Sequence, residues 1–197
     1  MLTCDRVTLT RAEERLASYL AEARYTENRK RGIPDNLRSP RDPLEAEREG
    51  ISAELAFCRS QNIYPDLSNS IRRGGFDCVL QPHPHSARGL RLDVKSVRES
   101  WKDLITTPNK KHEQRVDAFV LVCGKTPHYE VVGWTPFADL VNDARLVDLG
   151  YGPTYLMPRN NLFPIGTLYD ATPHLIDDQE SWASALHVPS AHEVADA

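Results

Sequence analysis

Side chains alternate between apolar and polar from residue 90 to residue 97, a pattern typical of a half-buried β-strand. Asp93 and Lys95 fall on the polar face of this strand, about 6.5–7 Å apart along it. Residues 75–80 form a second predicted strand, in which Asp77 is a lone carboxylate among apolar neighbours. Pairing of the two strands as a hairpin would bring Asp77 beside Asp93.

Two helices are predicted upstream of these strands. Thr10 and Glu13 form a capping box, and apolar residues at helical spacing continue from there to about residue 31. A second helix spans residues 43–61, and Glu54 lies at the margin of its apolar stripe. A carboxylate in that position needs a partner, because burying a lone charge is costly. Two alternatives stay open, namely an ion pair with an arginine or a place in a metal site.

The second half of the chain continues the alternation of strands and helices. Residues 116–123 are almost continuously apolar, which favours a central strand covered on both faces. Residues 129–134 then form an antiparallel partner, and residues 135–140 begin another helix. From residue 149 the chain is rich in Gly, Pro and Asn, and we expect it to fray beyond Tyr169. The predicted fold class is α/β with one mixed sheet.

We divide the 197 residues into three parts. Residues 1–43 form an N-terminal helix and a basic linker, residues 44–145 the core, and residues 146–197 a C-terminal extension with an acidic, mobile tail.

No apolar run reaches the ~20 residues of a membrane span, and no secretory signal is seen. We therefore expect a cytoplasmic protein. Its cysteines are widely spaced and form no metal or redox motif, so we expect free thiols at Cys4, Cys58, Cys78 and Cys123.

The charge distribution is compatible with a nucleic-acid partner. The net charge is −4, but residues 171–197 carry five acidic and no basic side chains, so the rest of the chain sums to +1. Residues 28–41 and residues 88–115 are both basic, and phosphate binding depends on such local patches rather than on total charge. The side chains in these segments that we expect to contact DNA phosphates are Arg38, Arg41, Lys110, Lys111 and Arg115.

One constellation in the core resembles that of a known enzyme family. Glu54 on a helix, Asp77 on one strand and the triplet of residues 93–95, Asp-Val-Lys, on the next resemble the PD-(D/E)XK nuclease superfamily, which includes restriction endonucleases and Holliday-junction resolvases. The resemblance covers about residues 44–134. It implies a restriction-endonuclease-like core with a mixed β-sheet flanked by helices, and a helix followed by a strand within residues 100–123.

The resemblance also implies roles for individual residues. Asp77 and Asp93 would ligate Mg²⁺, or Mn²⁺ as a substitute, together with the backbone carbonyl of Val94. Lys95 would orient the attacking water and help to deprotonate it, and Glu54 would complete the metal shell. The implied activity is metal-dependent hydrolysis of DNA phosphodiester bonds, most simply by an endonuclease, and cutting both strands would suit a homodimer.

Two departures from the family pattern and two other interpretations accompany this hypothesis. Phe76 stands where the family name has proline, and Ala118 stands where RecB-like exonucleases have a tyrosine. A non-catalytic inhibitor or accessory subunit on the same fold is the main alternative, in which Asp93 and Lys95 would form only a surface ion pair. A metallophosphatase built on His83 and His85 lacks a sufficient number of ligands.

Overall fold

The structure, a computed structural model, describes residues 5–32, 42–68, 75–86, 88–108, 116–150 and 152–177. Its strands are β1 (Asp5–Thr8), β2 (Cys78–Leu80), β3 (Leu90–Val97), β4 (Leu104–Thr106), β5 (Ala118–Lys125), β6 (His128–Pro136), β7 (Leu146–Asp148) and β8 (Pro153–Met157). Its α-helices are α1 (Arg11–Lys30), α2 (Pro43–Ser60), α3 (Phe137–Leu140) and α4 (Leu168–Asp177). Short 3₁₀ turns occur at residues 143–145, 159–161 and 165–167.

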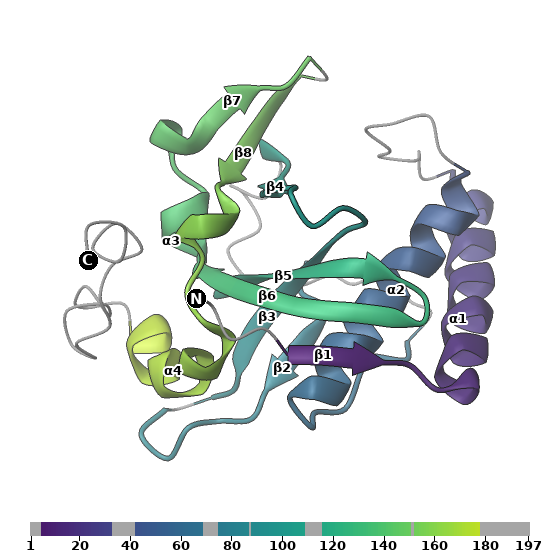
Figure 1. Ribbon diagram of the computed structural model, residues 1–197, viewed down its shortest axis with the longest axis horizontal. Coiled ribbons are helices and arrows are strands. Elements are labelled where there is room, and N and C mark those ends of the chain that lie inside the picture. The colour runs from purple at the N-terminus through teal and green to yellow at the C-terminus, as the bar shows by residue number, and fades with distance from the viewer. Residues whose placement is uncertain are drawn as a thin grey trace.

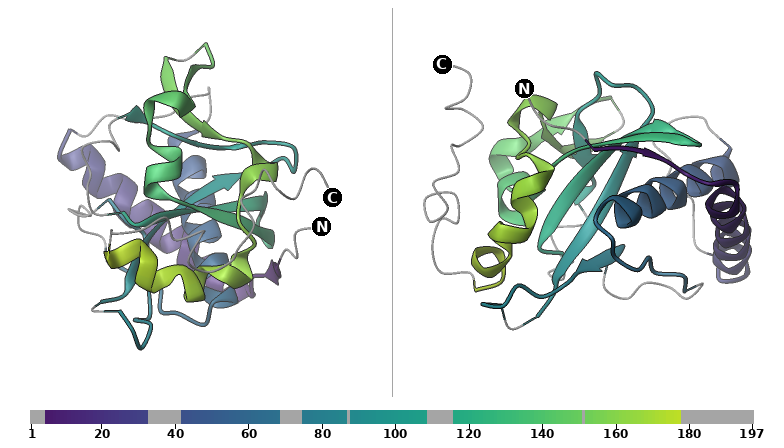
Figure 2. Two further views of the ribbon diagram at one scale, coloured as in Figure 1. Left: turned by 90° about the vertical axis from the view of Figure 1, so that its left-hand side faces the viewer. Right: turned by 60° about the horizontal axis from the view of Figure 1, so that its bottom comes forward.

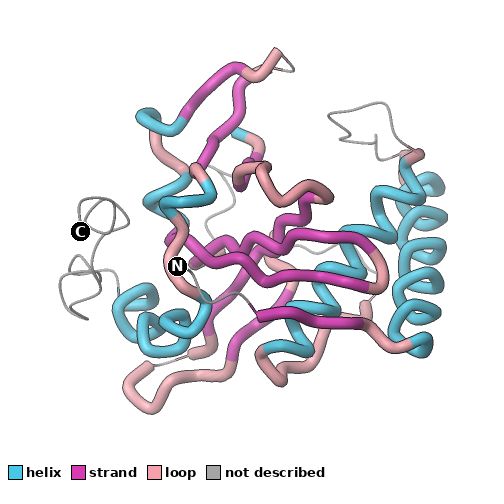
Figure 3. Tube along the Cα trace, in the orientation of Figure 1, coloured by secondary structure: helices cyan, strands magenta, loops and turns pink. Residues whose placement is uncertain are grey.

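The strands form two sheets (Figure 1). The larger has the order β1-β6-β5-β3-β2, in which β3 and β5 are parallel and all other neighbours are antiparallel. The smaller has the order β4-β8-β7, and its β7–β8 hairpin projects from the body of the molecule. Helix α2 packs against the larger sheet and α1 packs on the outer side of α2, while α4 lies at the opposite end of the molecule (Figures 2 and 3).

Strand β5 lies at the centre of the core. Its side chains alternate between two apolar clusters, so that Val120 and Val122 pack with α1 and α2, whereas Phe119 and Leu121 pack with β4, β8 and α3. All four residues are fully buried. The prediction of a central strand covered on both faces is therefore confirmed, and its neighbour β3 is held rigidly in register by the parallel pairing.

Much of the predicted secondary structure is confirmed. The α/β class, the two long helices, the capping box at Thr10 and the strand at residues 90–97 are all present. Strand β2 pairs with β3 as the predicted hairpin, although it begins only after Asp77. Strand β6 is also found antiparallel to β5, as expected.

Several predictions were wrong. Two sheets are present rather than one, and strand β1, which the pattern did not indicate, pairs with the edge of β6. Within residues 100–108 the structure has strand β4 rather than a helix, because Leu104 and Thr106 face the buried side and pair with β8. The chain does not fray at Tyr169, since α4 continues to Asp177.

No helix among the described residues has the length and apolar character needed to cross a membrane.

Candidate functional site

Asp77 and Asp93 lie side by side, where β2 meets β3. Cys78 pairs with Leu92, so the antiparallel register places Asp77 opposite Asp93. The backbone N–H of Asp77 donates to the carbonyl of Leu92 at 2.7 Å, and its Oδ2 accepts from the backbone N–H of Val94 at 2.7 Å. The Asp77 carboxylate is thus fixed against the strand that carries the triplet.

Asp93 and Lys95 form a close ion pair on the polar face of β3. Lys95 Nζ lies 2.6 Å from Oδ1 of Asp93. The Asp93 side chain is only 2% exposed, whereas that of Lys95 is 29% exposed. The pair is therefore not a simple surface ion pair, because its carboxylate is withdrawn from water while its ammonium group reaches the solvent. A buried carboxylate is stable only with such a partner.

Glu54 is engaged by an arginine from the neighbouring helix. Arg24 on α1 approaches Glu54 Oε2 with its Nη1 at 3.5 Å, and both side chains are largely buried. Arg24 also donates to the carbonyl of Asp66 at 3.0 Å and to that of Ser68 at 3.3 Å. Of the two alternatives for Glu54, the ion pair is present in the structure. A role of Glu54 in a metal shell stays a prediction.

Two buried cysteines follow the candidate residues Glu54 and Asp77 in the chain. Cys58 follows Glu54 by one helical turn on α2, and Cys78 directly follows Asp77; both are free and buried. A hydrogen bond with Cys58, burial, and the nearby carboxylates of Asp77 and Glu54 together hold the pKa of the Cys78 thiol well above its usual value. Both carboxylates therefore disfavour ionisation of the Cys78 thiol.

The described residues do not contain a group of three or more His, Cys, Asp or Glu side chains that could hold a metal ion. Mg²⁺ in proteins is usually bound by one or two carboxylates, with waters and substrate phosphates as the other ligands. Asp77, Asp93 and the Val94 carbonyl are a donor set of that kind. They fit an ion that binds together with a phosphate-containing substrate rather than one held in an all-protein cage.

The sequence also singled out two histidines and five basic side chains. His83 and His85 form a local pair in which the His85 backbone N–H donates to His83 Nδ1 at 3.2 Å, and the His83 ring packs on Tyr169. The predicted phosphate contacts all lie outside the described residues: Arg38, Arg41, Lys110, Lys111 and Arg115.

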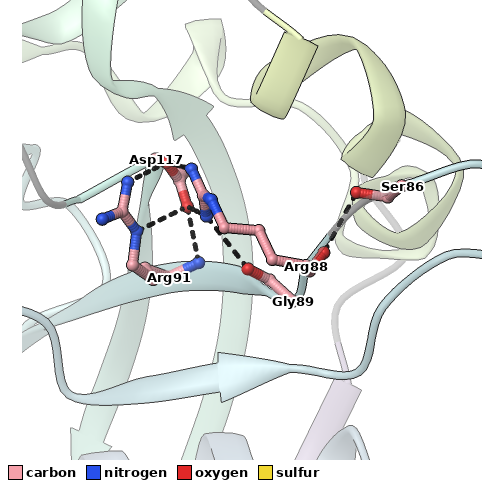
Figure 4. A network of polar contacts seen from close by, with 5 residues as sticks. All are labelled: Ser86, Arg88, Gly89, Arg91 and Asp117. Atoms are coloured by element: carbon pink, nitrogen blue, oxygen red, sulfur yellow. Dashed lines mark hydrogen bonds and ion pairs between the residues drawn. The ribbon is translucent and has the colours of Figure 1, made fainter.

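Sequence reasoning missed a second charged group, which joins the start of β3 to the residue before β5 (Figure 4). The Asp117 side chain, 6% exposed, accepts hydrogen bonds from two arginines and from the backbone N–H of Arg91. Arg88 contributes Nη1 at 2.6 Å and Nη2 at 2.8 Å, and Arg91 contributes Nη2 at 2.9 Å and Nε at 3.1 Å. Burial raises the pKa of Asp117, but the hydrogen bonds from Arg88 and Arg91 outweigh it and hold that pKa below its usual value.

The turn before β3 fixes Arg88 in this network. A Cβ atom on Gly89 would lie 2.4 Å from the carbonyl oxygen of Leu80, so only glycine allows the two ends of the hairpin to approach this closely. Arg88 Nη1 also donates to the Gly89 carbonyl at 3.0 Å, and Ser86 Oγ donates to the Arg88 carbonyl at 3.0 Å. The alternation of residues 90–97 reveals the face of Arg91, but no sequence signal joins it to Arg88 and Asp117.

Comparison with known proteins finds no matching family model, no similar curated protein and no similar solved structure.

Proposed function

We propose that the protein is a metal-dependent nuclease that hydrolyses DNA phosphodiester bonds, acting as an endonuclease. The observation that carries this proposal is the carboxylate–lysine site, defined as Asp77, Asp93 and Lys95. It joins a buried carboxylate in contact with an ammonium group, 2.6 Å away, to a second carboxylate held against the same strand by the Val94 N–H.

The order of the surrounding elements supports the proposal. Helix α2 precedes the antiparallel pair β2–β3, and β5 then runs parallel to β3. A restriction-endonuclease-like core has this sequence of elements, with the aspartate and the triplet on its two adjacent strands. The connection from β3 to β5 differs, since its described part contains β4 instead of the expected helix.

The residues suit the reaction in distinct ways. Hydrolysis of a phosphodiester requires neutralisation of charge on the reacting phosphate and a correctly placed water. Asp77, Asp93 and the Val94 carbonyl would hold Mg²⁺, which when bound supplies Lewis acidity at the phosphate. Lys95, partly exposed beside Asp93, can donate a hydrogen bond to the attacking water or to a phosphate oxygen and so orient one relative to the other.

Glu54 would have a supporting role in this arrangement. Its carboxylate is tied to Arg24 and acts, together with Asp77, on the buried Cys78 thiol. We assign it a place in the metal shell, contributed from α2, rather than a contact with the phosphate.

The proposal is tested by incubating the protein with supercoiled plasmid, linear duplex, single-stranded DNA, a branched junction and RNA, each with Mg²⁺, Mn²⁺ or EDTA. We expect cleavage of at least one DNA substrate with either metal and none with EDTA. Cleavage that persists in EDTA would contradict the metal requirement. Tight DNA binding without cleavage of any substrate would instead favour the non-catalytic alternative.

A further inference from the structure

The group formed by Arg88, Arg91 and Asp117 carries more positive charge than its own structure requires. Two guanidinium groups share one carboxylate, so the group has a net charge of +1. A single arginine carries enough charge to neutralise one buried carboxylate. The Asp117 side chain is withdrawn from water, whereas those of Arg88 and Arg91 are 38% and 24% exposed. The excess charge therefore faces the solvent.

Both arginines keep donors for a further ligand. A guanidinium has five N–H groups. Within the described part of the chain, the hydrogen bonds to Asp117 and to the Gly89 carbonyl engage three of these in Arg88 and two in Arg91. The remaining N–H groups of Arg88 and Arg91 are in fixed positions, because each guanidinium group is already held by two hydrogen bonds to the Asp117 carboxylate.

The group also lies on the same face of β3 as the carboxylate–lysine site. Arg91 precedes Asp93 by two residues, and Asp93 precedes Lys95 by two. Their side chains thus follow one another along the polar face of the strand at intervals of about 6.5–7 Å. Successive phosphates along one DNA strand are separated by a comparable distance, so that a phosphate beside Arg91 can neighbour the one at the site.

We propose that Arg88 and Arg91, positioned by Asp117, form an arginine clamp for one phosphodiester group of the DNA backbone next to the phosphate that is cut. This inference rests on the proposed function and extends it by assigning a substrate contact. A bound phosphodiester would bring the net charge of the clamp to zero. Planar guanidinium groups match the geometry of phosphate oxygens, and contacts of this kind fix the register of DNA without reading its sequence.

The clamp is tested with a fluorescein-labelled 30-base-pair DNA duplex of mixed sequence, in EDTA so that no cleavage occurs. Its affinity is measured over a series of KCl concentrations for the wild type, Arg88→Ala and Arg91→Ala. We expect each variant to bind roughly tenfold more weakly, because it loses a charge-assisted hydrogen bond. The slope of log affinity against log salt should fall by about 0.9, the value for one lost phosphate contact.

Arg98→Ala is the matched control. Arg98 is 36% exposed, similar to Arg88, but pairs with two carboxylates, Glu45 and Glu49, so its surroundings do not attract phosphate. This variant removes the same charge and should leave the salt slope unchanged. A wild type that does not bind the duplex, or clamp variants whose slopes match that of Arg98→Ala, would overturn the proposal.

Circular dichroism and thermal unfolding establish that each variant is folded. If an alanine variant is unfolded, Arg88→Lys and Arg91→Lys replace it, because they keep the charge but lose the planar fork. The clamp then predicts weaker binding at a nearly unchanged salt slope, and wild-type affinity in both would contradict it. Failure of the clamp is distinguishable from failure of the nuclease: a wild type that cleaves while the salt slopes are unaltered rejects only the clamp. A wild type with the predicted slopes but no cleavage in Mg²⁺ rejects only the nuclease.

Discussion

Two charged groups occupy neighbouring positions on one face of β3, and their charge balance is opposite. The carboxylate–lysine site has two carboxylates and one ammonium group, so its net charge is −1. The arginine clamp has two guanidinium groups and one carboxylate, so its net charge is +1. In each group a buried aspartate, Asp93 or Asp117, anchors partners that reach the solvent. The first composition suits a cation and the second suits a phosphate.

Under the proposed function, the comparison indicates how a chain with a net charge of −4 would act on DNA. Metal-assisted cleavage needs negative charge at the reacting position and positive charge at its flanks. Placing both on one strand, with β5 fixed alongside by parallel pairing, holds their separation constant. The predictions below separate the two groups, because each variant should alter one property and spare the other.

The largest effect is expected from the carboxylates. Asp93→Asn and Asp77→Asn should each lower the initial rate of Mg²⁺-dependent duplex cleavage by about 10³-fold, in line with the loss of a directly acting charged group, while the duplex affinity in EDTA does not fall. The matched control is Asp148→Asn, which removes an exposed carboxylate on β7. Rates in the two site variants within threefold of this control would remove Asp77 and Asp93 from the mechanism.

Lys95 should have the next largest effect. Lys95→Ala is expected to lower the cleavage rate by about 10²-fold, with Mg²⁺ binding still measurable by calorimetry because lysine does not ligate the ion. Lys95→Arg should not restore the rate, since the larger planar guanidinium cannot place its donors where the compact ammonium group places them. Full activity of Lys95→Arg would reduce the role of Lys95 to charge alone.

Asp117→Asn should affect stability more than chemistry. The variant is expected to lower the free energy of unfolding by about 1.5–3 kcal/mol at pH 7, the range for hydrogen bonds to charged groups. The pKa of Asp117 is lowered by folding, so its contribution is complete above the ordinary value of 3.8 and is lost as the pH falls through the folded-state pKa. Urea unfolding at pH 7 and pH 3 should show a smaller difference between variant and wild type at pH 3; an equal difference at both would contradict the ion-pair account.

Glu54 should have the smallest effect on cleavage. Glu54→Gln keeps a hydrogen-bond acceptor for Arg24 but removes the charge, and we expect a rate lower by about threefold to tenfold. The ion pair that it forms with Arg24 is the reason for this ranking, because its charge is already balanced by that partner. A loss as large as that of Asp93→Asn would instead place Glu54 among the direct metal ligands.

The local pattern was sufficient for much of the fold. Alternation over residues 90–97 predicted β3 and the shared face of Asp93 and Lys95, and the capping box at Thr10 predicted the start of α1. The pattern did not reveal that Asp93 is buried, since alternation gives the face of a side chain but not what covers it. The neighbouring strand β5 packs on one face against β4, β8 and α3. Those elements arise from short segments whose strand character depends on pairing between distant residues, such as Leu104 with Met157.

The arginine clamp could not be predicted from the sequence for the same reason. Asp117 is separated from Arg91 by 26 residues and from Arg88 by 29, and only the parallel register of β3 with β5 brings them together. Glu54 and Arg24 are 30 residues apart on different helices, so the sequence could propose an arginine partner but not identify it.

The central claim is most directly tested by plasmid nicking with three proteins in parallel: the wild type, Asp93→Asn and Asp148→Asn. With Mg²⁺ and enzyme in excess, the account predicts that the wild type and Asp148→Asn convert supercoiled DNA to nicked and linear forms at equal rates. Asp93→Asn should leave the plasmid supercoiled over the same interval, as should the wild type in EDTA. Nicking by Asp93→Asn at the wild-type rate, or no nicking by the wild type under any of these conditions, would contradict hydrolysis at the carboxylate–lysine site.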